Sequence, residues 1–275
     1  MLKKILCTIK RAAQMAIVVM IGFSVSLGIY ISIEESLKFP QDHELRGLDN
    51  ISRDLSARET RAVTASRNSI LHVLSSREDS RGVSSMSGTY VEHEDRFYVI
   101  TAAHGVSGDC TRFFVATDSD NIYDCVRYIV IDRFKDYAII EIEQVAGRTP
   151  VKLKEIIPTN REWLQETAAL NSVFYTGYPN SLGPLTFQGS VAGVSDENYI
   201  FLHSYAWPGS SGAGVFSYSG NMIGIIIALN VGYTAAGYDV LEDLVIVTPL
   251  FMIDWPATYN IMDDVPIAYD TGGTE

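Results

Sequence analysis

Between residues 68 and 248 the chain consists of short apolar runs separated by clusters of turn-forming residues. Runs of four to ten residues rich in β-branched and aromatic side chains are typical of β-strands, and the Asp, Asn, Ser and Gly clusters between them are typical of hairpin turns. Many short strands with few helices predict an all-β sandwich or barrel. The runs form two sets: 70–74, 89–92, 97–102, 112–117, 122–131 and 137–142, then 172–178, 185–194, 199–204, 214–218, 222–229 and 244–248. The stretch 154–169 separates them, tolerates a helix best, and is interpreted as an interdomain connection.

Residues 12–33 contain no charged side chain. At about 1.5 Å per residue, a helix of this length spans roughly 33 Å, enough to cross a hydrocarbon core of roughly 30 Å. Basic residues precede it and two acids follow, so the positive-inside rule predicts a single-pass membrane protein with a cytoplasmic N-terminus. The remainder would lie on the periplasmic or extracellular side, with the lipid bilayer contacted through residues 12–33. A cleaved signal peptide, with a poor site at residues 24–26, and a buried core helix are the alternatives.

The segment 34–66 is polar and densely charged, and we interpret it as a stalk that lifts a domain off the membrane. One short amphipathic helix is possible within it, because apolar residues recur between 45 and 55 at spacings of three or four. Residues 250–255 are expected to form a short C-terminal helix. Residues 257–275 are expected to form a loose acidic tail.

The net charge of −12 disfavours nucleic acid as a partner. Three cysteines without a paired CxxC spacing indicate neither a disulfide scaffold nor a structural zinc site, and no cofactor or metal is predicted. Cys110 and Cys125 flank the predicted turn near residue 118, and a disulfide between them is permitted outside the cytoplasm. Their offset about that turn is not ideal, so whether they are bonded stays open.

Three short motifs carry candidate chemistry. His104 follows an apolar strand and two small residues, a rigid and uncrowded place for a catalytic base. Asp136 heads the apolar run 137–142, where a half-buried carboxylate needs a partner such as an imidazole N–H. Ser211 lies in Gly209-Ser210-Ser211-Gly212, where glycines permit backbone N–H groups to face a developing oxyanion. Taken singly, each has an ordinary alternative: a surface histidine, a turn aspartate and a flexible loop.

Together, in the order His, Asp, Ser, the motifs resemble those of the trypsin/chymotrypsin-like serine proteases. The run Thr101-Ala102-Ala103-His104 and the Gly-x-Ser-Gly turn carry the likeness, which extends from about Gly88 to Pro249. The spacing and the predicted membrane tether look most like the HtrA (Deg) type. Only 26 residues follow Pro249, so the likeness is to such a protease without a PDZ domain.

The resemblance implies two antiparallel six-stranded β-barrels with the active site in the cleft between them. The protease domain would cover 67–256, with barrel 1 at about 67–150 and barrel 2 at about 170–250. It also implies a serine endopeptidase acting on proteins or peptides through an acyl-enzyme, with Ser211 as nucleophile, His104 as base and Asp136 orienting His104. The backbone N–H groups of Gly209 and Ser211 would form the oxyanion hole.

Two details concern activation and specificity. Ser210 stands where trypsin-type enzymes carry an Asp that pairs with a new N-terminus, so activation by that route is not expected. By position in the family, Tyr205 is expected at the floor of the primary pocket and Ile226, Ile227 and Ala228 on the strand that pairs with substrate. No acid lies at the floor, which predicts an apolar or small preferred residue rather than Lys or Arg.

Other classes remain open on the sequence alone. One is a catalytically inactive or latent barrel that binds peptides. Another is a viral-type processing protease, since Pro208 followed by Gly-x-Ser-Gly also occurs in such enzymes. A third is a structural membrane protein in which the motifs arose by chance. Barrels of the HtrA type are often trimers, so a homo-oligomer is possible, although no residue demonstrates it.

Overall fold

The computed structural model describes residues 56–76, 82–117, 121–153, 160–234 and 237–264. The chain divides into two compact units, residues 1–54 and 55–275, and the described residues belong to the second. The expected membrane segment, 12–33, and most of the expected stalk lie outside them. Within the described part, no helix is long and apolar enough to span a bilayer.

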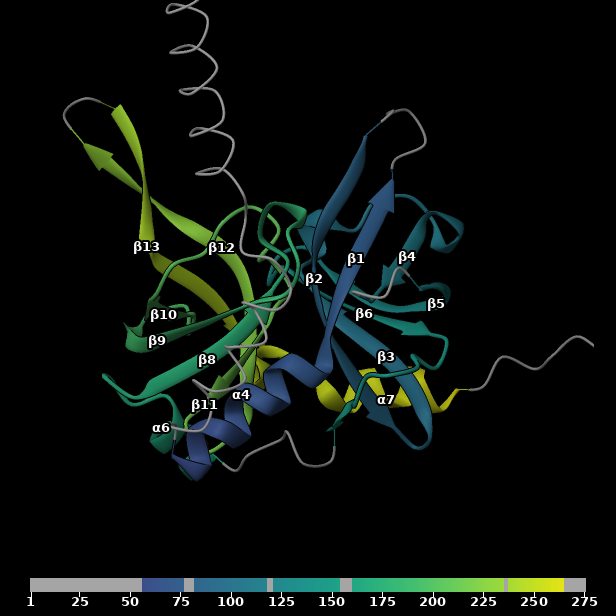
Figure 1. The fold of residues 1–275 in the computed structure, drawn as a ribbon, viewed down its shortest axis with the longest axis horizontal. Coiled ribbons are helices and arrows are strands. Elements are labelled where there is room, and N and C mark those ends of the chain that lie inside the picture. Colours follow the sequence, from purple (N-terminus) through teal and green to yellow (C-terminus); the bar gives the residue numbers. More distant parts are fainter. Residues whose placement is uncertain (1–55, 77–81, 118–120, 154–159, 235–236, 265–275) are drawn as a thin grey trace, which may run out of the picture. The chain divides into compact units, whose positions relative to one another are not determined.

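The first six strands close into a barrel (Figure 1). They are β1 (Ile70–Ser76), β2 (Val83–His93), β3 (Arg96–Thr101), β4 (Phe113–Ala116), β5 (Ile122–Asp132) and β6 (Tyr137–Ile142). The order is β1-β4-β5-β6-β3-β2, and antiparallel pairing of β1 with β2 completes the ring. A two-residue strand, β7 (Val151–Lys152), adds to β2 in parallel.

The second six strands form another closed barrel, in the order β10-β13-β12-β11-β8-β9. They are β8 (Ser172–Gly177), β9 (Leu185–Val194), β10 (Ile200–His203), β11 (Gly214–Ser217), β12 (Met222–Thr234) and β13 (Gly237–Pro249). All their pairings are antiparallel. The predicted all-β class with two six-stranded antiparallel barrels is therefore confirmed. In the chain, the short helix α6 (Asn160–Glu166) comes between the strands of the two barrels, within the stretch expected to tolerate one.

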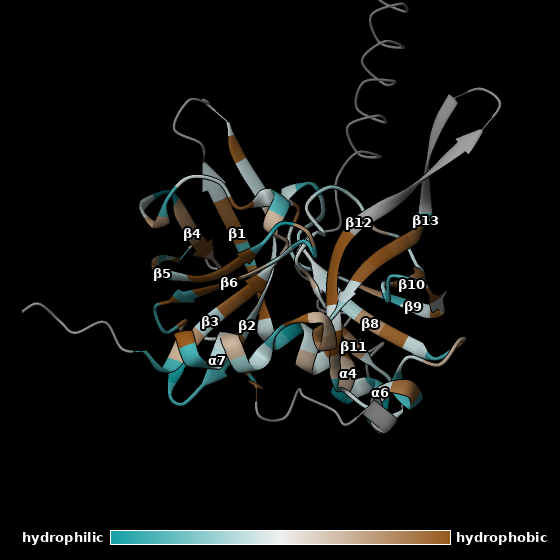
Figure 2. Cartoon of the chain, turned by 180° about the vertical axis from the view of Figure 1, so that it is seen from behind, coloured by the Kyte–Doolittle hydropathy of each residue, from teal (hydrophilic) through white to brown (hydrophobic). Residues whose placement is uncertain are grey.

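Successive side chains of β6 point to opposite faces of the strand, so barrel 1 packs on both its inner and its outer side. All six residues of this strand are buried. Ala138, Ile140 and Ile142 face the barrel interior with Leu71, Val99 and Phe113, as members of one core cluster. Tyr137 and Ile139 face the opposite way, into a cluster shared with barrel 2 and the C-terminal helix. Figure 2 shows the apolar residues concentrated along the strands of both barrels.

Helix α4 (Ala57–Ser69) corrects the expected stalk boundary at 66. Ser56 and Glu59 form a capping box, in which the Ser56 hydroxyl accepts from the Glu59 N–H and the Glu59 carboxylate accepts from the Ser56 N–H. Ala62 and Ser66 are buried, and the helix packs against β8 and β11. From Ser56 onward the chain is therefore part of the folded domain rather than a spacer.

The C-terminal boundary also differs from the expectation. Residues 250–255 form only a 3₁₀ turn, Leu250–Met252, and the α-helix α7 (Trp255–Asp263) follows it. Asp254 caps this helix by accepting from the Ala257 N–H at 3.1 Å. Trp255, Thr258 and Met262 are buried, and α7 packs against β5. The loose tail predicted from residue 257 was therefore wrong as far as Asp263.

Candidate active site

His104 and Asp136 meet at one end of barrel 1. His104 lies in the 3₁₀ turn Ala103–Gly105 directly after β3, and Asp136 lies directly before β6, which pairs with β3. The distance from His104 Nδ1 to Asp136 Oδ2 is 2.7 Å, and the His104 backbone N–H donates to Asp136 Oδ1 at 2.7 Å. One carboxylate thus holds both the ring and the main chain of the histidine. Half of the His104 side chain (51%) remains exposed, against 20% of Asp136.

The loop that carries Asp136 is anchored from several sides. Asp136 itself has φ +56°, a left-handed conformation that Asp tolerates better than most residues. The Arg133 guanidinium donates to the carbonyls of Ala103 and Val106, which flank His104. The Lys135 carbonyl accepts from Thr248 Oγ1 at 2.7 Å, across the junction with barrel 2. The loop therefore keeps the carboxylate in register with the imidazole.

Residues 207–210 form a closed turn before Ser211. The Ser210 N–H donates to the Trp207 carbonyl at 2.9 Å, and Gly209 has φ +97°. The carbonyls on either side of Gly209 are both engaged: Pro208 accepts from the Asn180 N–H at 2.6 Å, and Ser210 from the Ala213 N–H at 3.0 Å. Among the described residues, none accepts from the N–H groups of Gly209 and Ser211. Because N–H and C=O point in opposite directions in a trans peptide, these two N–H groups are left available for a ligand oxyanion.

Ser211 is fixed against barrel 1 by the residues around it. Its carbonyl accepts from the Ser87 N–H of β2 at 2.9 Å. At Gly212, which has φ +87°, an added Cβ would lie 2.0 Å from the Ser87 carbonyl oxygen, so only glycine fits. The Gly212 N–H then donates to the Ile226 carbonyl at 2.6 Å. The half-buried Ser211 therefore sits at the junction of the two barrels.

The three residues of the His, Asp, Ser pattern are thus supplied by both barrels: His104 and Asp136 by barrel 1, Ser211 by barrel 2. Within the described residues, no hydrogen bond joins the His104 ring to the Ser211 hydroxyl. Such contacts are often long in the absence of substrate. Ser210 is buried, and its hydroxyl accepts from the Trp207 N–H at 3.4 Å within its own turn.

The expected pocket residues differ in their exposure to solvent. Tyr205 is 62% exposed and lines a cavity of about 290 Å³ with residues of β9 and β10, so its side chain is not a buried pocket floor. Ile226 and Ile227 are buried, and the Ile226 N–H donates to the Ala213 carbonyl beside the nucleophile turn. Ala228 lies in β12 after a register shift and pairs with Ile246 of β13. Within the described residues, β12 pairs with β11 only as far as Ile225. Beyond Ile226, this edge of β12 therefore has no partner strand.

A second cavity was not predicted from the sequence. It measures about 270 Å³, adjoins His104, and is lined by small and polar residues: Ser75, Gly82, Val83, Ser84, His104, Gly105 and Ser107. These residues come from β1, β2 and the turn after β3, which are separated in the chain, so no local motif marks them.

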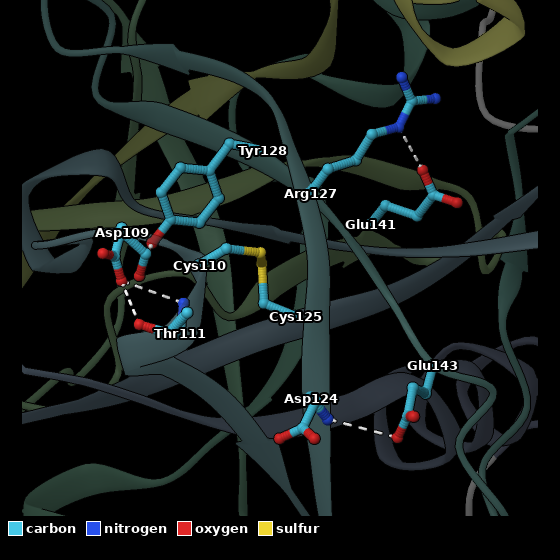
Figure 3. Close-up of a disulfide and its surroundings, with 9 residues drawn as sticks. All are labelled: Asp109, Cys110, Thr111, Asp124, Cys125, Arg127, Tyr128, Glu141 and Glu143. Carbon is cyan, nitrogen blue, oxygen red and sulfur yellow. Dashed lines mark hydrogen bonds and ion pairs between the residues drawn. A yellow bond between two sulfur atoms is a disulfide. The ribbon is translucent and has the colours of Figure 1, made fainter. Parts of the chain in front are cut away.

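Cys110 and Cys125 form a disulfide that joins the 3₁₀ turn Cys110–Arg112 to β5 (Figure 3). Beside it, the Tyr128 hydroxyl donates to the Asp109 carbonyl at 3.0 Å. Burial raises the pKa of Tyr128 to about 12, so this hydroxyl stays a donor. The disulfide bond lies within barrel 1 and joins none of the three candidate catalytic residues.

One group of described residues has the side-chain types of a metal site. His93 and Glu94 at the β2–β3 hairpin and Asp263 at the end of α7 place their ligand atoms within 4.8 Å of one another. The His93 Nε2 already contacts Asp263 Oδ1 at 3.2 Å, which ties α7 to barrel 1. The group lies on strands and a helix that hold none of the candidate catalytic side chains, and the reaction discussed below does not use it.

Comparison with known proteins agrees with this geometry. The crystal structure of the serine endoprotease from Yersinia pestis matches with a TM-score of 0.57 and 19% sequence identity, covering 77% of this chain and 69% of that chain. At this identity the likeness shows the fold alone. No curated protein matches the sequence. The family model described as a trypsin-like peptidase domain matches residues 86–225, about half of the chain and including His104, Asp136 and Ser211. The chain therefore belongs to the trypsin-like peptidase family.

Proposed function

We propose that this protein is a serine endopeptidase that uses Ser211, His104 and Asp136 as a catalytic triad. The observation that carries the proposal is the pair of contacts from one Asp136 carboxylate to His104, together with a turn whose Gly209 and Ser211 N–H groups have no acceptor among the described residues. Membership of the peptidase family supports the reaction class.

The contact with Asp136 determines the tautomer of His104. An ionised carboxylate only accepts hydrogen bonds, so Nδ1 carries the proton and Nε2 keeps its lone pair. Nε2 then takes the Ser211 hydroxyl proton as Oγ bonds to the peptide carbonyl carbon. The carbonyl oxygen becomes an oxyanion held by the Gly209 and Ser211 N–H groups. When the C–N bond breaks, Nε2 returns the proton to the leaving amine, and water releases the acyl group by the same steps.

The test uses the full-length chain in detergent with a fluorophosphonate probe, which reacts with activated serine. We expect the wild type to be labelled, and Ser211→Ala and His104→Ala not to be labelled. Labelling of Ser211→Ala at the wild-type level would refute the assignment. If the folded wild type is not labelled, the alternative of a latent peptide-binding barrel is favoured.

For substrate binding, we propose that a peptide adds as a strand to the edge of β12 after Ile226. Main-chain hydrogen bonds would supply affinity there, and side-chain pockets would supply specificity. Ile226 and Ile227 at the start of this edge are apolar, and we propose an apolar or small preferred residue. Cleavage-site mapping on a denatured protein mixture tests this, and cleavage mainly after Lys or Arg would refute it.

We further propose that residues 12–33 anchor the protease domain to a membrane, on the side opposite the cytoplasm. The support is the uncharged run behind four basic residues. The Cys110–Cys125 disulfide suits an oxidising compartment. Fractionation after carbonate extraction tests the anchor: the full chain is expected in the membrane pellet at its complete mass of 30.4 kDa. A product about 3 kDa smaller would indicate a cleaved signal peptide instead.

A further inference from the structure

The direction of the Gly209 N–H depends on the type of the turn at residues 207–210. The Ser210 N–H to Trp207 carbonyl bond closes the turn, and φ +97° at Gly209, its third residue, is typical of a type II turn. Type I and type II turns have the same ends but differ by a rotation of roughly 180° of the central peptide. That peptide is Pro208-Gly209, so a change to type I would turn the Gly209 N–H away from the site.

A bond from outside the turn holds the central peptide in place. The Asn180 N–H donates to the Pro208 carbonyl at 2.6 Å. Asn180 belongs to the 3₁₀ turn Pro179–Ser181 and has φ +51°, so the donor is itself on a strained segment. The orientation of the Gly209 N–H therefore depends on where residues 178–180 lie relative to the turn.

The Ser87 hydroxyl connects these two segments. It accepts from the Tyr178 N–H at 2.9 Å and donates to the Gly209 carbonyl at 2.7 Å. Ser87 is fully buried, so removing its hydroxyl leaves the Tyr178 N–H and the Gly209 carbonyl without this partner. Its main chain is also engaged, because its N–H donates to the Ser211 carbonyl and its carbonyl accepts from Thr101 Oγ1, three residues before His104.

We propose that Ser87 is a positioning residue of the oxyanion hole: its hydroxyl clamps residues 178–180 to the turn at 207–210 and so keeps the Gly209 N–H directed at the reacting carbonyl. The proposal rests on the proposed function. It assigns to Ser87 no contact with substrate, and its effect passes through Asn180, Pro208 and Gly209. Because the clamp acts on the oxyanion, it stabilises the transition state more than the bound substrate.

The test measures acylation of the full-length chain by p-nitrophenyl acetate in a rapid-mixing instrument. The burst amplitude counts competent sites, whereas the burst rate constant reports stabilisation of the tetrahedral intermediate. For Ser87→Ala we expect a full amplitude and a rate constant lower by about 10–100-fold, short of the roughly 10²–10³-fold loss when an oxyanion donor is deleted. The pH midpoint of the rate, which reports the base, is expected to stay unchanged.

Ser66→Ala is the matched control. Ser66 of α4 is also buried, and its hydroxyl donates to Thr176 Oγ1 of β8 at 2.8 Å, so it also joins two separate elements. Within the described residues this hydroxyl bonds neither to residues 178–181 nor to the turn at 207–210, and the rate constant of the variant is expected within about twofold of wild type. Ser87→Cys, which keeps the shape with a weaker donor, is expected to be intermediate, and it replaces the alanine variant if that one fails to fold.

The outcomes separate this inference from the proposed function. A wild-type rate constant in both Ser87 variants would overturn it. A reduced amplitude with an unchanged rate constant would show a merely structural role and would also overturn it. If Ser211→Ala gives the same burst as wild type, the proposed function itself is refuted, and the role of Ser87 in an oxyanion hole is refuted with it.

Discussion

At the scale of single residues, the Asp136 carboxylate has two tasks: it orients the His104 ring and it accepts from the His104 backbone N–H. In Asp136→Asn the amide retains the size and the tolerance of φ +56°, but its NH₂ group favours the wrong imidazole tautomer. We expect kcat to fall about 10³–10⁴-fold with little change in melting temperature. Hydrolysis of p-nitrophenyl acetate and thermal unfolding measure the two effects.

The control for this substitution is Asp124→Asn. Asp124 is an exposed carboxylate on β5 of the same barrel (Figure 3), so the change removes the same charge without touching His104. Its kcat is expected to equal that of wild type. An equal loss in both variants would show that net charge, and not the His104 tautomer, is responsible.

His72 predicts a pH dependence of stability. Its Nε2 contacts Ser85 Oγ, and its ring stacks on Tyr178, whose hydroxyl accepts from Arg148. Burial lowers the pKa of His72 below its ordinary value of 6.5. Above pH 6.5 the imidazole is neutral in both states, whereas below it the unfolded chain binds more protons, so stability is lost as pH falls.

Urea unfolding at about pH 7.5 and about pH 5.5 tests this. In His72→Gln the loss of unfolding free energy between the two pH values is expected to be smaller than in wild type, because one proton-linked group is gone. An equal loss in the two proteins would contradict the assignment to His72.

At this scale, the sequence predicted those functional residues that stand in local motifs. His104, Asp136 and the glycines around Ser211 stand in short motifs that point to one chemistry. Ser87 and Asn180 stand in none, because their importance comes from contacts with a turn about 120 and 28 residues away along the chain. Tyr205 was expected at a pocket floor by its distance from Ser211 in the chain, but its side chain turns outward.

At the scale of elements, Glu141 of β6 joins the C-terminal helix to barrel 1. Its carboxylate is 10% exposed and accepts from both Arg96 and Arg127, whose guanidinium groups also donate to the Met262 carbonyl at the end of α7. Glu141→Gln removes the carboxylate that two largely buried cations share. We expect it to lower the free energy of unfolding by about 3–5 kcal/mol in urea titrations.

Glu143→Gln supplies the comparison for that measurement. Glu143 follows β6 and is exposed, and its contact with the Asp124 N–H is long, at 3.4 Å. Its removal is expected to change the unfolding free energy by less than about 0.5 kcal/mol. Similar losses in both variants would refute a special role for the buried pair of arginines.

The disulfide is a second link between elements. Cys110 and Cys125 are 15 residues apart, and the bond closes the loop through β4. A loop of this length restricts the unfolded chain by about 3 kcal/mol in the chain-entropy model. The double variant Cys110→Ser, Cys125→Ser is expected to unfold at correspondingly lower urea, and wild type with reductant to behave like it. If the reduced wild type unfolded at the same urea concentration as the oxidised wild type, this expectation would be contradicted.

The sequence predicted the ends of those elements that apolar runs or alternating apolar and polar residues mark. It predicted less well the ends that depend on tertiary contacts. All twelve expected runs lie within or close to observed strands, but β2 and the β12–β13 hairpin extend beyond the runs that marked them. Helix α4 was missed because its sequence is polar on average, although the capping box at Ser56 and Glu59 was a readable signal. Helix α7 continues past residue 257 because Met262 and Trp255 reach the shared core.

At the scale of the whole described domain, one apolar cluster belongs to both barrels. It contains Tyr98 and Ile139 of barrel 1, Phe174 and Phe216 of barrel 2, and Trp255 of α7. The candidate catalytic residues are divided between the same two barrels. The geometry of the site therefore depends on packing at this junction, in addition to the local bonds of each motif.

Trp255→Ala tests whether the junction makes the barrels unfold as one. Trp255 is 6% exposed, and its indole N–H donates to the Leu250 carbonyl at 2.9 Å. Removing it leaves a cavity in the shared cluster, with an expected cost of about 3–5 kcal/mol. If the barrels unfold as one, the rate of amide hydrogen exchange increases by the same factor in β6 of barrel 1 and in β11 of barrel 2. Both strands then report global unfolding. Faster exchange confined to β6 would mean that α7 stabilises barrel 1 alone, and that the bonds across the junction, including those around Ser87 and from Thr248 to Lys135, do not make the two barrels unfold together.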